Sequence, residues 1–475
     1  MSECIPLFQP TFNRAIRVEA RADQVTSDAG VVLLRELEEK LGITSWLSGR
    51  LVDPRDPSRV QHSLSELFRT RLLTTVMGWT NQDDIKRLSS DPALRLAASD
   101  ARGEAAADTT ELASQPTLSR MMALLSNPTN LEILNEALAV LAGRSLRAQN
   151  GGKPVEVVLD IDSIVLEVHG HQDGSAYNGQ YGLTAYHPLV AVLGETGDIV
   201  GIWLRPGNAH TASQAVEFME GVITRVEAQV GPVQAVRLDA GFPSEPLMEA
   251  LEMRGTPYVA RIRKNTCLTG LADWATLPML PPPETTRTQF KEMMYQAGSW
   301  SRARRLVYVR IDEPGELFSR GFFLVSSIPA ETLAAEELLA LYRRRGCAED
   351  AFGQWMGAVS PTLCSTNRKK STFRGEAPKT EAVPVDPFAV NEANLILSAL
   401  ASNLLVAFRR LVVVATSTPW RLDRLRDQIL KVGARVIRGA RRITLCVARS
   451  ATGHWEKIVA EIERFSPVLE VVRTT

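Results

Sequence analysis

The sequence predicts an α/β protein in which helices flank a mixed sheet, with a β-rich insertion and with helical regions at both ends. Three observations support this fold class. Residues 151–263 read as three short strands followed by helix, strand, helix and strand; residues 264–328 carry further β-like stretches; and residues 1–150 and 391–475 show helical periodicity. With 475 residues, 45% of them hydrophobic, the chain has the length and composition for roughly two to four domains with buried cores.

Residues 1–150 are predicted to form a mainly helical N-terminal region that binds DNA. Val31, Leu34 and Leu37 recur at helical spacing, and Gly42 supplies a stop signal. Further helices are predicted at 62–78, 82–98, 116–126 and 128–147. Short helices joined by tight turns are typical of a helix-turn-helix DNA reader. They are equally typical of a structural bundle, and no spacing here separates the two interpretations.

The strand predicted within residues 155–168 carries two carboxylates. Leu159 and Ile161 fall on one parity, whereas Asp160 and Asp162 fall on the other, so a period-2 strand presents both acids on one face. An ionised carboxylate on an otherwise apolar strand needs a cationic partner, hydrogen bonds or a metal ion. The alternative is a strand end whose carboxylates simply reach solvent.

The other strands and helices predicted within residues 151–263 surround the strand that carries Asp160 and Asp162. Strands at 186–193 and 199–207 flank a turn and form a meander, and a helix opened by a capping box at Thr211 runs past Val226. A strand at 233–242, a helix at 244–254 and a strand at 257–263 follow. This order is the layout of a ribonuclease-H-like core. Its first strand lies beside its fourth, which brings Asp162 near Asp239, and two such close carboxylates call for a divalent cation.

The segment after the β-rich insertion is predicted as a core helix over residues 329–360. Tyr342, Arg345 and Glu349 are spaced by three and four residues, which aligns them on one helix face. Solvated charges on a surface helix give the same pattern. Beside two strand-borne aspartates, however, Glu349 can supply a third metal carboxylate, while Arg345 and Tyr342 can hold phosphate or the DNA backbone.

Two further segments complete the prediction. Residues 361–390 read as a polar loop, and residues 391–475 as a basic helical C-terminal region. Ten Arg and one Lys against two Asp within residues 401–450 give 11 − 2 = +9, in a chain with 54 basic and 54 acidic residues overall. Such a patch suits a polyanion, although an arginine-rich surface of paired helices carries the same charge.

The cysteines and the N-terminus indicate a soluble cytoplasmic protein with no membrane partner. The five cysteines are scattered and form no CxxC pair, which is typical of a reducing compartment. The first ten residues lack the basic and apolar regions of a signal peptide, and no run of 18 uninterrupted apolar residues occurs.

These motifs give the chain a family resemblance. Asp162-Ser163, Asp239-Ala-Gly-Phe and the spacing of Tyr342, Arg345 and Glu349 resemble the DDE transposases of bacterial insertion sequences, in the group with a β-rich insertion before the glutamate. The nearest named group is the insertion-sequence family numbered thirteen-eighty. The similarity extends from about residue 8 to 450, and it includes the stretches 194–210 and 391–405.

The resemblance implies a DNA transposase, a metal-dependent polynucleotidyl transferase, in the bacterial cytoplasm and associated with the nucleoid. Asp162, Asp239 and Glu349 are then both catalytic and metal-binding, with Mg²⁺ or Mn²⁺ as cofactor and two ions in the site. Tyr342 and Arg345 are expected to bind DNA phosphate. The implied partners are the double-stranded terminal inverted repeats and target DNA, with a homodimer in a synaptic complex.

Two features depart from the family pattern or leave alternatives open. Met356 stands where the family has Lys, seven residues after Glu349, so a domesticated DNA-binding derivative without cleavage is one alternative. Asp160 could be a neighbouring carboxylate or itself the metal ligand. The stretch LDIDSIV also resembles the first motif of haloacid-dehalogenase-type phosphatases, with Asp160 as nucleophile and Asp162 as acid, but no convincing paired-acid motif follows.

Overall fold

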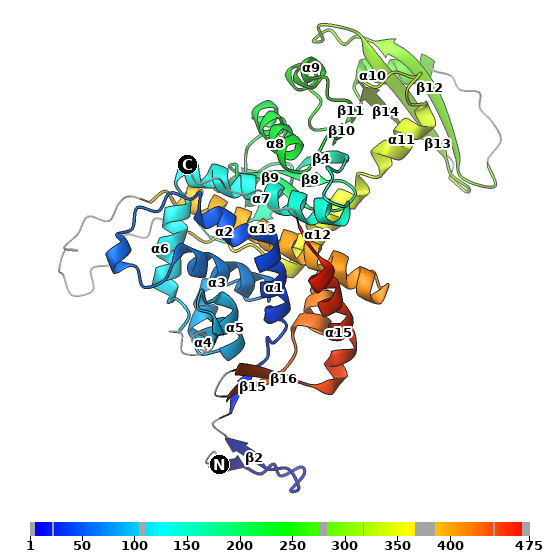
Figure 1. The fold of residues 1–475 in the computed structure, drawn as a ribbon. Helices are drawn as coiled ribbons and strands as arrows, with labels where there is room; N and C mark the ends of the chain where they lie inside the picture. The colour runs from blue at the N-terminus through cyan, green and yellow to red at the C-terminus, as the bar shows by residue number, and fades with distance from the viewer. Residues whose placement is uncertain are drawn as a thin grey trace.

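The computed structural model describes residues 5–20, 23–103, 111–170, 172–274, 283–316, 318–365, 385–439 and 442–467. Figure 1 shows a helical body, formed by the N-terminal helices in blue together with C-terminal helices in orange and red, on one side of a central sheet. Long strands of the sheet extend away from this body in light green. The candidate residues lie where the sheet and the helical body meet.

The central sheet has eight strands in the order β12-β13-β14-β11-β10-β4-β8-β9. Their bounds are β4 (Val157–Ser163), β8 (Leu189–Leu193), β9 (Ile199–Trp203), β10 (Val233–Leu238), β11 (Tyr258–Ile262), β12 (Arg287–Tyr295), β13 (Arg304–Asp312) and β14 (Arg320–Ser326). Strand β4 runs parallel to β10 and antiparallel to β8. The expectation that the first core strand lies beside the fourth is therefore confirmed.

The β-rich insertion extends the central sheet. Strand β14 pairs antiparallel with β11, so β12, β13 and β14 continue the sheet at its edge. Helix α10 (Thr266–Trp274) precedes these strands, and α11 (Ala335–Arg343) packs on them through a cluster that includes Val307, Leu324 and Leu338. The insertion thus positions α11, which leads into the candidate site.

The two faces of the sheet bury different partners. On β8, Leu189 and Leu193 pack in the cluster that contains α8 (Ala215–Gln229) and α9 (Glu245–Arg254), whereas Val190 faces the helical body. A strand buried on both faces reads as a continuous apolar run, as LVAVL does. Helix α8 starts later than the sequence predicts, because Gln214 adopts a left-handed conformation (φ 60°) before it and no side chain caps the helix.

A small sheet with order β5-β7-β6 flanks the meander. It contains β5 (Leu166–Glu167), β6 (Ala176–Asn178) and β7 (Leu183–Tyr186). The single strand predicted at 186–193 is consequently divided between β7 and β8. Pro188 has no N–H to donate to a strand ladder, and the chain changes sheets at this residue.

The N-terminal region is helical from α1 onward, as predicted. Its helices are α1 (Val31–Leu41), α2 (Ile43–Ser48), η1 (Pro57–Arg59), α3 (Leu64–Val76), η2 (Gln82–Asp84), α4 (Ile85–Leu88), α5 (Pro92–Ala98), α6 (Gln115–Leu125) and α7 (Pro128–Gln149). Gly42 ends α1 in a left-handed conformation. The single helix predicted at 82–98 is divided, because Pro92 cannot continue a helix and instead begins α5 after the cap Asp91.

Helix α13 (Pro387–Thr416) is the core helix of the body. Its most apolar 18-residue window has a mean hydropathy of 1.7, and in the described part of the chain α13 is the one helix long and apolar enough to cross a membrane. Yet 83% of that window is buried inside the protein. It contacts α3, α7 and β9, so its apolar surface is covered by other elements. Burial on all sides explains its composition.

The C-terminal region is not helical throughout, contrary to the sequence prediction. After α14 (Leu422–Leu425) and η4 (Arg426–Leu430), a hairpin of β15 (Ala434–Gly439) and β16 (Arg442–Val447) precedes α15 (Arg449–Arg464). Strand β15 pairs with β3 (Gln24–Thr26), near the hairpin of β1 (Ile5–Phe8) and β2 (Val18–Ala20). The pairing of β15 with β3 joins residues about 410 positions apart in the chain, which sequence periodicity cannot indicate. The hairpin of β15 and β16 is local, with Gly439 opposite Arg442, and the helical prediction for this region was wrong there.

Candidate active site

The three predicted acids come from three different elements. Asp162 lies near the end of β4, Asp239 directly follows β10, and Glu349 occupies the first turn of α12 (Gly346–Val359). Asp160 lies opposite Val192 and Asp162 opposite Val190, so both acids share the sheet face turned to the helical body. The predicted parity of the two aspartates is confirmed.

One guanidinium group joins the three acids. Arg345 Nη2 lies 2.5 Å from Asp162 Oδ2, whereas its Nη1 lies 4.0 Å from Asp239 Oδ1 and 3.5 Å from Glu349 Oε1. The exposed fraction of the side chains rises from 18% for Asp162 through 46% for Asp239 to 69% for Glu349. Asp162 therefore forms the floor of the cluster and Glu349 its solvent-facing rim.

The single helix predicted around Glu349 is two helices. Helix α11 ends at Arg343 and α12 begins at Gly346, and the Arg345 N–H donates to the Tyr342 carbonyl at 3.0 Å. This three-residue bond closes a tighter turn than an α-helix does. Tyr342 thus ends one helix, while Arg345 and Glu349 open the next.

Burial and mutual charge perturb the protonation of the cluster. Burial raises the pKa of Asp162, Arg345 opposes that rise, and Asp239 and Glu349 reinforce it. Burial acts to lower the pKa of Arg345, but Asp162 and Asp239 outweigh it and raise the pKa. Burial, reinforced by the nearby aspartates, also raises the pKa of Tyr342. Five ionisable groups in one cluster with such couplings are typical of a functional site.

The cluster has the donor chemistry of a divalent-cation site. Its acids supply only carboxylate oxygens, which Mg²⁺ and Mn²⁺ prefer. In the described ranges no group of three His, Cys, Asp or Glu side chains is close enough to hold a metal ion as it stands. Here the guanidinium of Arg345 supplies the positive charge on which Asp162, Asp239 and Glu349 converge.

Asp160, on the same face as Asp162, has a different partner. Its two carboxylate oxygens accept from Arg237 Nε and Nη2, each at 2.6 Å, and neither side chain has any exposed surface. Both oxygens are committed, so Asp160 is placed neither to attack a phosphate nor to bind an ion. Sequence reasoning missed Arg237, although a charged residue inside the apolar strand VQAVRL was a signal that it needs a buried partner.

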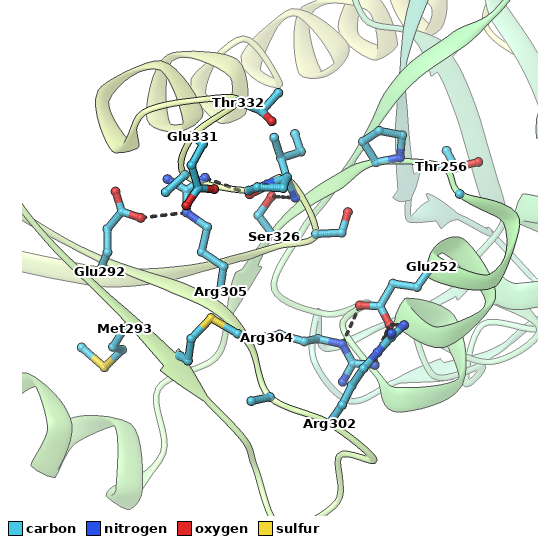
Figure 2. A pocket seen from close by; sticks show the side chains of 18 residues that line it. Glu252, Thr256, Glu292, Met293, Arg302, Arg304, Arg305, Ser326, Glu331 and Thr332 are labelled. Atoms are coloured by element: carbon cyan, nitrogen blue, oxygen red, sulfur yellow. Dashed lines mark hydrogen bonds and ion pairs between the residues drawn. The ribbon is translucent and has the colours of Figure 1, made fainter.

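A cavity of about 790 Å³ lies elsewhere, between α9, the strands of the insertion and the segment leading to α11 (Figure 2). None of the five candidate residues lines it. Figure 2 shows its arginines turned to acids: Arg304 pairs with Glu252, and Arg305 Nε lies 2.8 Å from Glu292. The cations of this cavity are thus neutralised within the protein, and we place the candidate site at the acid cluster.

Other predicted contributors have defined positions. Met356, on α12, packs against the main hydrophobic cluster. Several arginines of the 401–450 segment bind inside the protein, such as Arg410 with Asp198 and Arg426 with the Ala358 carbonyl. The +9 charge is therefore only partly presented to solvent. Most of the polar loop predicted at 361–390, residues 366–384, lies outside the described residues.

The family of the chain follows from comparison with known proteins. The model of the family "Transposase DDE domain group 1" matches residues 8–372 and 376–466. The chain therefore belongs to this family, and it is a transposase with a DDE domain. No curated protein matches the sequence.

Solved structures also give matches. One is a piggyBac transposase synaptic complex with hairpin DNA, which shares 13% sequence identity over 94% of this chain and 84% of that chain, with a TM-score of 0.39.

Proposed function

We propose that the chain is a DDE transposase of a bacterial insertion sequence, with a ribonuclease-H-like core formed by β4, β8, β9, β10 and β11. It binds the terminal inverted repeats of its element, cleaves DNA phosphodiester bonds and joins the 3′-OH ends to target DNA. The observation that carries this proposal is the convergence of Asp162, Asp239 and Glu349 on the guanidinium of Arg345. Membership of the DDE family supports the reaction class.

Asp162, Asp239 and Glu349 would hold Mg²⁺ or Mn²⁺, as the family generally uses divalent ions. A pair of such ions would activate the attacking water and neutralise charge on the leaving 3′ oxygen. The reaction is an in-line displacement: the water oxygen forms a bond to phosphorus, the bond to the 3′ oxygen breaks, and that oxygen leaves as 3′-OH. In the joining step the freed 3′-OH attacks a phosphodiester of the target.

Arg345 and Tyr342 would hold the DNA at this site. A guanidinium binds phosphate oxygens through two parallel hydrogen bonds, and a phenol can donate one more. Both side chains already lie within the electrostatic reach of Asp162 and Asp239. Two element ends must be brought together for transposition, so we propose that the active form is a homodimer in a synaptic complex on double-stranded DNA.

The test is a cleavage assay on the natural ends. Short inverted repeats flanking the coding region supply the substrate, and a labelled terminal-repeat duplex is incubated with protein in Mg²⁺ or in EDTA. We expect cleavage at the repeat end in Mg²⁺ only. Binding without cleavage in Mg²⁺ or Mn²⁺ would instead support a domesticated DNA-binding derivative, which Met356 in place of the family lysine favours.

A further inference from the structure

We propose that Asp160 and Arg237 form a positioning pair that holds the break between α11 and α12, and so sets where Arg345 and Glu349 meet the two aspartates. This inference deepens the proposed function and rests on it, because it assumes that Asp162, Asp239 and Glu349 form the active site. Asp160 and Arg237 themselves are positioning residues.

The pair fixes the orientation of one guanidinium group. Asp160 and Arg237 are opposite each other in the parallel register of β4 and β10. Arg237 Nε and Nη2 each donate to one oxygen of Asp160 at 2.6 Å, and both side chains are fully buried. A two-point pair of this kind fixes the plane of the guanidinium. The remaining nitrogen, Nη1, therefore points in one direction only.

That remaining nitrogen reaches the end of α11. Arg237 Nη1 donates to the Leu341 carbonyl at 3.1 Å. In an unbroken α-helix this carbonyl would accept the N–H of Arg345. Here the Arg345 N–H bonds to the Tyr342 carbonyl instead. Arg237 thus satisfies the carbonyl that the helix break releases, and a partly buried carbonyl without a partner would oppose the break.

The pair fits beside Gly194 only because this residue has no side chain. A Cβ atom at Gly194 would lie 1.9 Å from Arg237 Nη2 and 2.8 Å from Asp160 Oδ2. Gly194 follows β8, and its N–H donates to the Val158 carbonyl at 2.8 Å, so it cannot simply move away from β4. A buried ion pair adds little stability compared with apolar residues of similar volume. We therefore attribute to this pair a role in positioning, and not in stability, because Arg237 Nη1 remains directed at the Leu341 carbonyl.

The experiment compares two variants that keep the buried charge balanced. Arg237→Lys retains the charge opposite Asp160 but lacks the rigid fork that reaches Leu341. The double variant Asp160→Leu/Arg237→Met removes both charges together. The matched control is Asp198→Leu/Arg410→Met, which removes another pair, of buried Asp198 with partly buried Arg410, that joins the end of the β8–β9 turn to α13. Each protein is assayed for Mn²⁺ affinity by calorimetry, for thermal unfolding, and for kcat and KM on the terminal-repeat duplex.

We expect both test variants to fold but to bind Mn²⁺ about tenfold or more weakly, the usual effect of removing a group that orients a metal ligand. The kcat should fall while KM for DNA stays within about twofold, and the control should keep the Mn²⁺ affinity of the unaltered protein. If the variants bind Mn²⁺ as tightly as the unaltered protein, the positioning role is overturned. If only one of the two variants folds, the Mn²⁺ affinity of that variant decides whether the role holds. If the unaltered protein itself binds no Mn²⁺, or if Asp162→Asn binds it equally well, the proposed metal site fails instead.

Discussion

Arg345 Nη2 lies 2.5 Å from Asp162 Oδ2, so a cation of the protein itself occupies the most buried carboxylate of the candidate active site. The same guanidinium reaches Asp239 and Glu349. These contacts tie together β4, the turn after β10 and the first turn of α12. They also make the charge of the cluster depend on one residue, Arg345.

Arg345→Gln should destabilise the protein when divalent ions are absent. The three carboxylates then repel one another without a shared cation, and we expect a loss of about 2 kcal/mol in EDTA. Mg²⁺ should restore part of this loss and should stabilise the variant more than it stabilises the unaltered protein. Urea unfolding with and without Mg²⁺ measures both effects. Arg344→Gln, at an exposed neighbour, is the control and should change stability by less than about 0.5 kcal/mol. Equal Mg²⁺ responses in all three proteins would contradict the prediction.

Glu349→Gln should reduce strand cleavage to the level seen in EDTA while it leaves folding and binding of the terminal repeat intact. The side chain is mostly exposed and forms a 3.5 Å ion pair with Arg345, so its loss costs little stability. Cleavage and gel-shift assays on one duplex separate the two activities. The adjacent acid, Asp350, pairs with Arg421 and not with Arg345, so the control variant Asp350→Asn should cleave DNA normally. Retained cleavage in Glu349→Gln would remove this residue from the site.

Gly194→Ala should destabilise the protein by about 1–3 kcal/mol, because the added methyl group overlaps Arg237 where the guanidinium is held on Asp160. Gly353→Ala is a matched control in α12, where an added Cβ meets nothing within 4 Å. That change should stabilise by up to about 1 kcal/mol, since alanine is the better helix former. Chemical denaturation measures the free energy of unfolding of both variants. If both substitutions change it in the same direction, the proposed overlap at Gly194 is wrong.

Glu392→Gln should stabilise the protein at pH 8 and leave stability unchanged near pH 4.5. Burial raises the pKa of Glu392 from 4.5 to about 7. Between these values the folded state holds a proton that the unfolded state has lost, so stability falls as pH rises and the loss is complete above about pH 7. Glutamine does not titrate and still accepts from the Leu204 N–H, so the gain at pH 8 is about 1–3 kcal/mol. Thermal unfolding of both proteins between pH 4.5 and pH 8 tests this prediction. Parallel curves of stability against pH for the two proteins would refute it.

Affinity for the terminal repeat should fall steeply and linearly with salt on logarithmic axes, because arginines displace counterions from DNA phosphates. Arg442 is exposed at the start of β16, and Arg442→Gln should reduce the slope by about 0.9 if it contacts one phosphate. Arg254 is the last residue of α9, which covers the other face of the sheet, so Arg254→Gln should leave the slope unchanged. Fluorescence anisotropy between about 50 and 200 mM salt gives the slopes. An unchanged slope for Arg442→Gln would exclude β16 from the contact.

The sequence predicts the positions of the acids better than their environment. Strand parity and strand order follow from local patterns of apolar residues, and they suffice to bring Asp162 near Asp239. The break before Gly346 could not be predicted in this way. The three arginines before it are good helix formers, and a single glycine costs a helix only about 1 kcal/mol, so Gly346 alone does not require a break. The donor that satisfies the released carbonyl, Arg237, lies 104 positions from Leu341 in the chain. Local periodicity likewise carries no information about which cation Asp160 or Asp162 binds.

The sheet that pairs β3 with β15 has a consequence for synthesis of the chain. The N–H groups of Ala29 and Gly30 bond to the carbonyls of Val432 and Leu430, and Lys431 Nζ lies 2.6 Å from Asp28. The first helix is thus anchored by a segment that is synthesised about 400 residues later. A polypeptide terminated before α13 lacks this anchor and the core helix, so it presents apolar surface to chaperones and proteases, and only chains translated past the anchoring segment should persist in the cell.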